Sequence, residues 1–126
     1  SYLVRALGRL GYTLEQNLIE VYPKATLHQL WGRQVARAYK REVETWETRA
    51  AVLEALRGKL EFGRRSRLAR EDVLRNDHNF DAMIAAYTAY LWAQEGWTLP
   101  VAGREVFQVD GWIWVPSSTP PAADTP

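Results

Sequence analysis

The 126-residue sequence predicts an α/β domain, and three observations support this fold class. The apolar run at residues 17–22 has apolar side chains on both faces and ends at a proline, which is typical of a buried strand, either parallel or central in its sheet. Several other segments repeat apolar residues at three and four positions, which is typical of helices. An Asp-Gly pair at 110–111 separates the β-rich runs 105–109 and 112–115 and predicts a hairpin.

Apolar residues at helical spacing predict the helices in order. The first covers residues 2–10 before Gly11, a second follows Pro23 with a weak point at Gly32, and the last covers residues 79–94 before Gly96. We interpret His28, in the second of these helices, as a partly buried polar residue. A longer helix between them has an apolar stripe, made of Val43, Trp46, Ala50, Leu53, Leu56 and Leu60, and charged residues off the stripe, namely Glu42, Glu44, Glu47, Arg49 and Glu54.

The composition is that of a folded domain and excludes several classes of protein. Apolar residues make up 47% of the chain and aromatic residues 12%, which argues against intrinsic disorder. The absence of cysteine excludes a disulfide framework, a cysteine-ligated zinc site and a thiol nucleophile. No uncharged apolar run approaches the ~20 residues of a membrane helix, and no signal-peptide pattern is present. We therefore expect a cytoplasmic protein that is not in a membrane.

Charge is distributed unevenly although the net charge is only +1. Residues 1–75 carry 15 basic and 9 acidic side chains, whereas residues 76–126 carry 1 basic and 6 acidic ones. The segment 57–70 is the most basic, and its arginines would suit contacts with phosphates, a solvated loop being the alternative. Residues 117–126 are rich in proline, serine and threonine, so we expect a disordered tail after a domain at 1–116.

Two carboxylates lie in apolar surroundings and are the candidates for chemistry. Asp81 is the only charged residue between positions 79 and 94, and His78 precedes it by one helical turn. Glu20 is embedded in the predicted strand. Such carboxylates need a compensating cation or hydrogen-bond donors, so the three residues suggest a site for a hard cation. The alternatives are an acidic first helical turn for Asp81 and a solvent-facing edge-strand position for Glu20.

Four segments, in this order along the chain, resemble a known family. They are Ile19–Leu27, the pair Tyr39-Lys40, His78–Ala89 and Gly111–Pro116. Together they resemble the C-terminal half of the predicted RNase H-like nucleases grouped as domain of unknown function 429. The resemblance implies a mixed sheet flanked by helices and hydrolysis of phosphodiester bonds with two divalent metal ions, Mg²⁺ or Mn²⁺.

The resemblance also assigns residues. Glu20 matches the family's strand glutamate, and His78 and Asp81 match a closing pair similar to that of the RuvC-type resolvases. Glu20 and Asp81 would then be metal ligands. His78 would either bind the metal as well or act as the group that orients and protonates during the reaction. No segment matches the first strand with its aspartate, so we expect a fragment that lacks the N-terminal strands and has an incomplete metal site.

The sequence therefore predicts residues 1–116 to be part of an RNase H-like, metal-dependent nuclease. Nucleic acid, DNA or RNA, is the expected partner, and its backbone would be bound by Arg64, Arg65, Arg67 and Arg70. A non-catalytic module of the same fold, binding nucleic acid or protein, is one alternative. The other is a structural piece whose Trp-rich hairpin completes the sheet of a second copy or of a partner chain.

Overall fold

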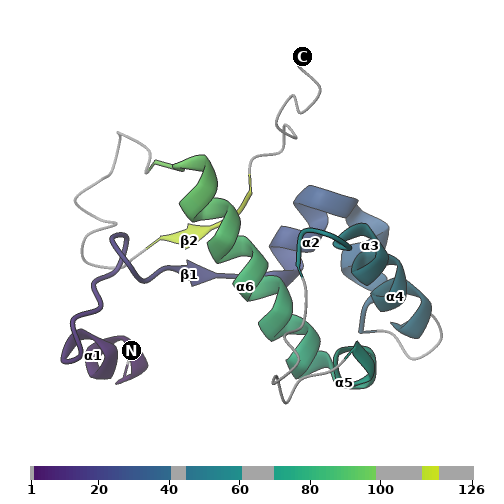
Figure 1. Ribbon diagram of the computed structural model, residues 1–126, viewed down its shortest axis with the longest axis horizontal. Coiled ribbons are helices and arrows are strands. Elements are labelled where there is room, and N and C mark those ends of the chain that lie inside the picture. Colours follow the sequence, from purple (N-terminus) through teal and green to yellow (C-terminus); the bar gives the residue numbers. More distant parts are fainter. Residues whose placement is uncertain (1, 41–44, 61–69, 99–111, 117–126) are drawn as a thin grey trace.

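The chain folds into a mixed α/β structure that is mostly helical (Figure 1). The computed structural model describes residues 2–40, 45–60, 70–98 and 112–116. The helices are α1 (Tyr2–Gly8), α2 (Pro23–Trp31), α3 (Arg33–Ala38), α4 (Thr45–Ala55), α5 (Arg70–Arg75) and α6 (Asp77–Glu95), and the strands are β1 (Glu20–Val21) and β2 (Ile113–Trp114). The α/β prediction is thus confirmed. None of the described helices has the length and hydropathy needed to cross a membrane.

Helix α6 is the central element, with the sheet beside it and α2 and α5 packed against it (Figure 1). It begins after Asn76, whose side chain accepts hydrogen bonds from the backbone N–H groups of His78 and Asn79 at 2.8 and 3.2 Å. It ends at Gly96, which adopts the left-handed conformation at φ 63°. The predicted helix at 79–94 is confirmed, and the asparagine cap starts it two residues earlier.

The two strands pair in parallel, with Glu20 opposite Ile113 and Val21 opposite Trp114. Trp114 is buried, and its ring lies 6.0 Å from that of Trp92 on α6. Side chains alternate along a strand, so Val21 and Trp114 share the face towards α6, and Glu20 and Ile113 lie on the opposite face. Glu20 is exposed there.

The strand prediction is confirmed in its parallel pairing, whereas the expected burial on both faces is wrong. No described element covers the face of β1 that carries Glu20, which is exposed, and Tyr22 after the strand is 53% exposed. Of the predicted hairpin, residues 113–114 form β2, while 105–111 lie outside the described residues. The tail at 117–126 lies outside them too.

The core forms where α2, α3, α4 and α5 meet α6. Its most deeply buried side chains are Leu27, Val52, Leu56, Val73, Phe80 and Ile84. Gly32, at φ 97°, separates α2 from α3, which confirms the predicted weak point. Leu27 on α2 and Ala36 on α3 both belong to the core cluster.

Helix α4 departs from its predicted pattern in two ways. It covers Thr45–Ala55 instead of continuing to Leu60, and Gly58 follows it at φ 83°. Arg49 is only 5% exposed although the spacing places it off the apolar stripe, and Trp46 is 52% exposed although the spacing places it on the stripe. Arg49 is buried because it finds backbone acceptors inside the molecule, while the stripe residues Leu53 and Leu56 are buried as predicted.

Helix α1 confirms the first predicted helix, but none of its residues is buried. Leu3 and Leu10, which the periodicity places on an inward stripe, are 64% and 75% exposed. The apolar face of α1 therefore makes no contribution to the core that the described residues form.

A buried pair of threonines joins α2 to α6. The hydroxyl of Thr88 donates to the Ile84 carbonyl at 2.7 Å, so in the 2.9 Å contact between the two threonine Oγ1 atoms Thr26 is the donor. Both side chains are fully buried.

Replacing each of these threonines by valine is expected to lower the stability of the protein by a different amount. Thr88→Val leaves the Thr26 hydroxyl without an acceptor and is expected to cost about 1 to 3 kcal/mol, whereas Thr26→Val leaves the Thr88 donor satisfied and is expected to cost about 1 kcal/mol. Urea denaturation of the single variants and of the double variant measures the coupling. Equal losses, or losses that add fully in the double variant, would contradict this assignment of donor and acceptor.

Candidate functional site

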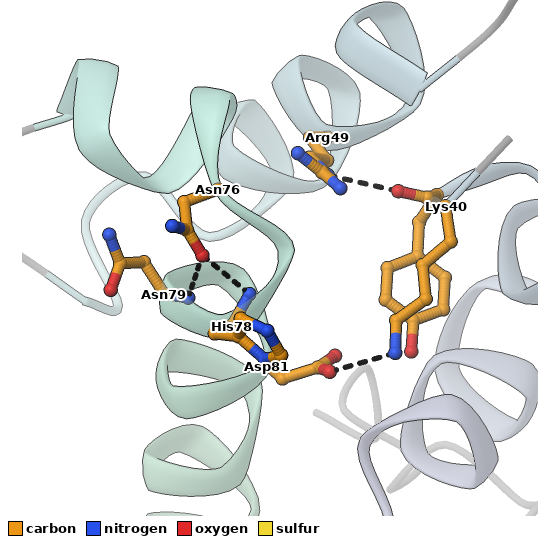
Figure 2. A network of polar contacts seen from close by, with 7 residues as sticks. Lys40, Arg49, Asn76, His78, Asn79 and Asp81 are labelled. Carbon is orange, nitrogen blue, oxygen red and sulfur yellow. Dashed lines mark hydrogen bonds and ion pairs between the residues drawn. The ribbon is translucent and has the colours of Figure 1, made fainter. Parts of the chain in front are cut away.

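Asp81 carries the candidate site, one turn into α6 (Figure 2). Its side chain is 24% exposed, and its Oδ2 atom lies 3.1 Å from the Nζ atom of Lys40. The other oxygen, Oδ1, is buried and has no hydrogen-bond partner among the described residues. The charge on Oδ2 is therefore neutralised by Lys40, whereas Oδ1 is shielded from solvent and has lone pairs that accept no hydrogen bond from the described residues.

Lys40 and Tyr39 come from the end of α3, where Tyr39 is the C-cap residue. The Lys40 ammonium lies 5.3 Å from the centre of the Tyr39 ring, so it contacts both an aromatic face and the Asp81 carboxylate. The hydrogen bond to Asp81 raises the pKa of Lys40 above its usual value. Lys40 thus stays charged at neutral pH and is a fixed cation rather than a general base.

Tyr39 is almost fully buried behind this ion pair, with 2% of its surface exposed. Burial, and next the negative charge of Asp81, raise the pKa of its hydroxyl to about 12. The phenol therefore keeps its proton at neutral pH, and a hydrogen-bonding interaction with the Asp81 side chain adds to the rise. We refer to Tyr39, Lys40 and Asp81 as the Asp81 cluster.

Arg49 fixes the backbone of this cluster (Figure 2). Its Nε atom donates to the Tyr39 carbonyl and its Nη1 atom to the Leu74 carbonyl, both at 2.9 Å. These carbonyls lie at the C-terminal ends of α3 and α5, where the helix dipoles favour a positive charge. Its guanidinium also lies 5.8 Å from the centre of the Phe80 ring, next to Asp81 in sequence.

His78 lies in the first turn of α6, and Figure 2 draws it beside the Asn76 cap. Its backbone N–H donates to the Asn76 side chain. The imidazole is exposed and shares no hydrogen bond or ion pair with Asp81 in the described part of the chain. His78 is thus on the same helix as Asp81 and accessible from solvent.

Glu20 is not brought together with Asp81. It faces away from α6, and its partner strand contacts α6 at Trp92. A helix rises 1.5 Å per residue, so Trp92 is about 16 Å along α6 from Asp81. Within residues 2–40, 45–60, 70–98 and 112–116, no three histidine or acidic side chains gather in a way that could hold a metal ion.

The predicted nucleic-acid contacts stay predictions. Arg64, Arg65 and Arg67 lie outside the described residues, and Arg70 is the first residue of α5. Nearer the start of that basic segment, Arg57 pairs with Glu54 at 3.2 Å on the surface.

The family model described as "Protein of unknown function (DUF429)" matches residues 3–105, which span most of the chain. The chain belongs to the DUF429 family. The resemblance seen in the sequence is thereby confirmed at the level of the family. No curated protein and no solved structure matches the chain.

In this DUF429 protein, the residues that sequence reasoning missed are the ones that surround Asp81. Tyr39 and Lys40 enter the sequence analysis only as part of the resemblance, and Arg49 only as a surface charge. A signal was available, because a lone carboxylate in an apolar helix requires a cation. That signal does not say which of the many basic residues supplies the charge.

Proposed function

We propose that this DUF429 chain is part of a cytoplasmic, metal-dependent nuclease of RNase H-like type that hydrolyses phosphodiester bonds in DNA or RNA. The observation that carries the proposal is the Asp81 carboxylate, whose buried Oδ1 has no hydrogen-bond partner among the described residues. The order of the four sequence segments that resemble predicted RNase H-like nucleases supports it. The resemblance adds Glu20 and His78 as further proposed site residues, although Glu20 is not brought together with Asp81 among the described residues.

Asp81 fits a divalent cation. Carboxylate oxygens are ligands that Mg²⁺ and Mn²⁺ prefer, and among the described residues no hydrogen-bond donor competes for Oδ1. Lys40 neutralises only Oδ2, so the carboxylate keeps a binding position at Oδ1. His78 and Glu20 are exposed and therefore have free coordinating atoms, although they do not form a gathered ligand set with Asp81.

Divalent ions, when bound, would supply an activated water and charge stabilisation for the leaving oxygen. The chain's own groups have separate tasks. Asp81 would hold the cation, and Lys40 keeps that carboxylate in place through a permanent charge. Tyr39 keeps a proton that it can share with an anionic oxygen, and the exposed His78 can accept or deliver one.

The first test is thermal unfolding with and without Mn²⁺ for the wild-type chain and for Asp81→Asn. Metal at 100 times its dissociation constant is expected to stabilise the wild type by about 2.7 kcal/mol, and this gain is expected to vanish in Asp81→Asn. Glu71→Gln is the matched control, because it removes one exposed carboxylate from α5 and should keep the full shift. A wild type that gains nothing from Mn²⁺ would contradict Asp81 as a ligand.

Lys40→Gln separates metal binding from the ion pair. The substitution removes the charge that competes for the Asp81 carboxylate, so the stabilisation by Mn²⁺ is expected to persist or grow. Cleavage of single- and double-stranded DNA and RNA in Mn²⁺ then tests the reaction itself, and loss of cleavage in Asp81→Asn but not in Glu71→Gln would support catalysis.

The second candidate is a module of the same fold that binds nucleic acid or protein without catalysis. The separation of Glu20 from Asp81, on opposite sides of the β1–β2 pair, favours it. Binding of nucleic acid that needs no divalent metal and is unchanged in Asp81→Asn would support this candidate over the nuclease.

A further inference from the structure

A hollow of about 470 Å³ lies where α2 meets α3, and neither Asp81 nor Glu20 is among its lining residues. Its size is in the range of small-molecule sites. The break at Gly32 places the two short helices so that both contribute to its lining. Two small residues, Ala25 on α2 and Ala36 on α3, are part of that lining and leave the space between the helices open.

The polar lining of the hollow is basic. Lys24 and His28 are four residues apart on α2, and Arg33 and Arg37 are four residues apart on α3. Because residues at this spacing lie on one face of a helix, each helix presents a pair of nitrogen-bearing side chains to the same hollow. All four side chains are exposed, and His28 is therefore not the partly buried residue that the sequence suggested.

Among the described residues, no carboxylate forms an ion pair with these basic side chains. None of the residues that line the hollow is acidic, and the sequence contains no aspartate or glutamate between Glu20 and Glu42. In the described part of the chain, the side chains of Lys24, Arg33 and Arg37 take part in no ion pair and no hydrogen bond. Three permanent cations around one concavity, without a counter-charge from the same segment, create a positive potential that attracts anions.

The chemistry of the lining favours phosphate among the anions. Two guanidinium groups offer planar forks of donors that match phosphate oxygens, and the Lys24 ammonium adds a point charge. Tyr22, 53% exposed, lies at the wall of the hollow and provides an aromatic face on which a nucleobase can stack.

We propose that the hollow between α2 and α3 is a binding site for a phosphate group carried by a nucleotide or by a single-stranded nucleic acid. Arg33, Arg37 and Lys24 bind the phosphate, and Tyr22 contacts the adjoining base. The site uses none of the residues of the Asp81 cluster and does not depend on a metal ion.

The test is fluorescence anisotropy with a short fluorescein-labelled oligothymidylate, in EDTA so that metal plays no part. Arg33→Gln/Arg37→Gln is expected to weaken binding at least about tenfold, because each arginine that is replaced takes charge-assisted hydrogen bonds away from the phosphate. The dependence of affinity on salt should also decrease, by about 0.7 in the logarithmic slope for each phosphate that is no longer neutralised. Tyr22→Ala is expected to weaken oligonucleotide binding without changing that slope.

Arg5→Gln/Arg9→Gln is the matched control. Arg5 and Arg9 are also exposed and four residues apart, and their removal changes the net charge by the same amount outside the hollow. This control should bind as the wild type does, and thermal unfolding verifies that both double variants are folded. Equal weakening in the two double variants, or no weakening in Arg33→Gln/Arg37→Gln, would overturn the proposal.

Competition with adenosine monophosphate and with inorganic phosphate identifies the source of the phosphate. If the oligonucleotide binds at least about tenfold tighter than the monophosphate, the ligand is a single-stranded nucleic acid, because each of its phosphates adds an ionic contact. Equal affinities indicate a free nucleotide or phosphate. Absence of binding by all of these probes would refute the site, and because EDTA is present that failure leaves the metal-dependent function of Asp81 untouched.

Discussion

Arg49→Met is expected to lower the free energy of unfolding by about 3 kcal/mol or more, because each of two charge-assisted hydrogen bonds contributes about 1.5 kcal/mol or more. Methionine fills much of the same buried space but donates no hydrogen bond. The Tyr39 and Leu74 carbonyls then lose their partners at the ends of α3 and α5. Urea denaturation of the two proteins measures the difference.

Two further variants isolate the cause. Arg49→Lys keeps the charge but lacks the planar fork that reaches two carbonyls at once, so its stability is expected to lie between those of the wild type and Arg49→Met. Arg57→Met removes an arginine from the exposed pair with Glu54 and is expected to change stability by about 0.5 kcal/mol or less. If Arg49→Met proved as mild as Arg57→Met, Arg49 would not be what holds α3 and α5 to α4.

Tyr39→Phe is expected to remove an alkaline loss of stability from the wild-type protein. The folded pKa of Tyr39 is raised from 10.0 to about 12, so the folded state binds this proton more tightly than the unfolded chain does. The resulting stabilisation is fully present below about pH 10 and is lost as the pH rises towards 12. Its size is about 2 to 3 kcal/mol, since each pKa unit corresponds to about 1.4 kcal/mol.

Chemical denaturation on both sides of this pH window measures the effect. Asp81→Asn is expected to reduce the alkaline loss without abolishing it, because burial is the main cause of the raised pKa and the Asp81 charge is second. Burial also raises the pKa of Tyr87, so Tyr87→Phe should remove a separate part of the loss and leave the effect of Tyr39→Phe unchanged. An alkaline loss of the same size in wild type and Tyr39→Phe would disprove the role of Tyr39.

Local sequence predicts the end of α6 at Gly96 and the break between α2 and α3, whereas the start of α6 and the end of α4 differ from the prediction. Asn76 and Gly96 bound α6 because a side-chain cap and a left-handed glycine act within a few residues of the helix. Gly32 divides α2 from α3 for the same kind of reason. The parallel character of the strand also follows from its apolar sequence, although its length and burial depend on neighbouring strands that the sequence of one strand does not contain.

The features that local sequence does not predict are pairings between distant residues. Arg49 is buried because it bonds to carbonyls of both α3 and α5. Periodicity in the sequence misses this, because it treats an arginine as a surface residue. The ion pair of Lys40 with Asp81 likewise joins two different helices. The basic hollow could be predicted only in part. The sequence shows the four-residue spacings of Lys24 with His28 and of Arg33 with Arg37, but only the turn at Gly32 brings the two pairs together.

The parallel pairing of β1 with β2 also bears on the order in which the parts of the chain fold. Trp114 donates a hydrogen bond from its ring to the carboxylate of Glu15, 99 positions earlier in the sequence. The loop that this contact closes contains α2 to α6, which pack through contacts closer in sequence. Closing so long a loop is slow and entropically costly. We therefore expect the helices to pack before β1 pairs with β2.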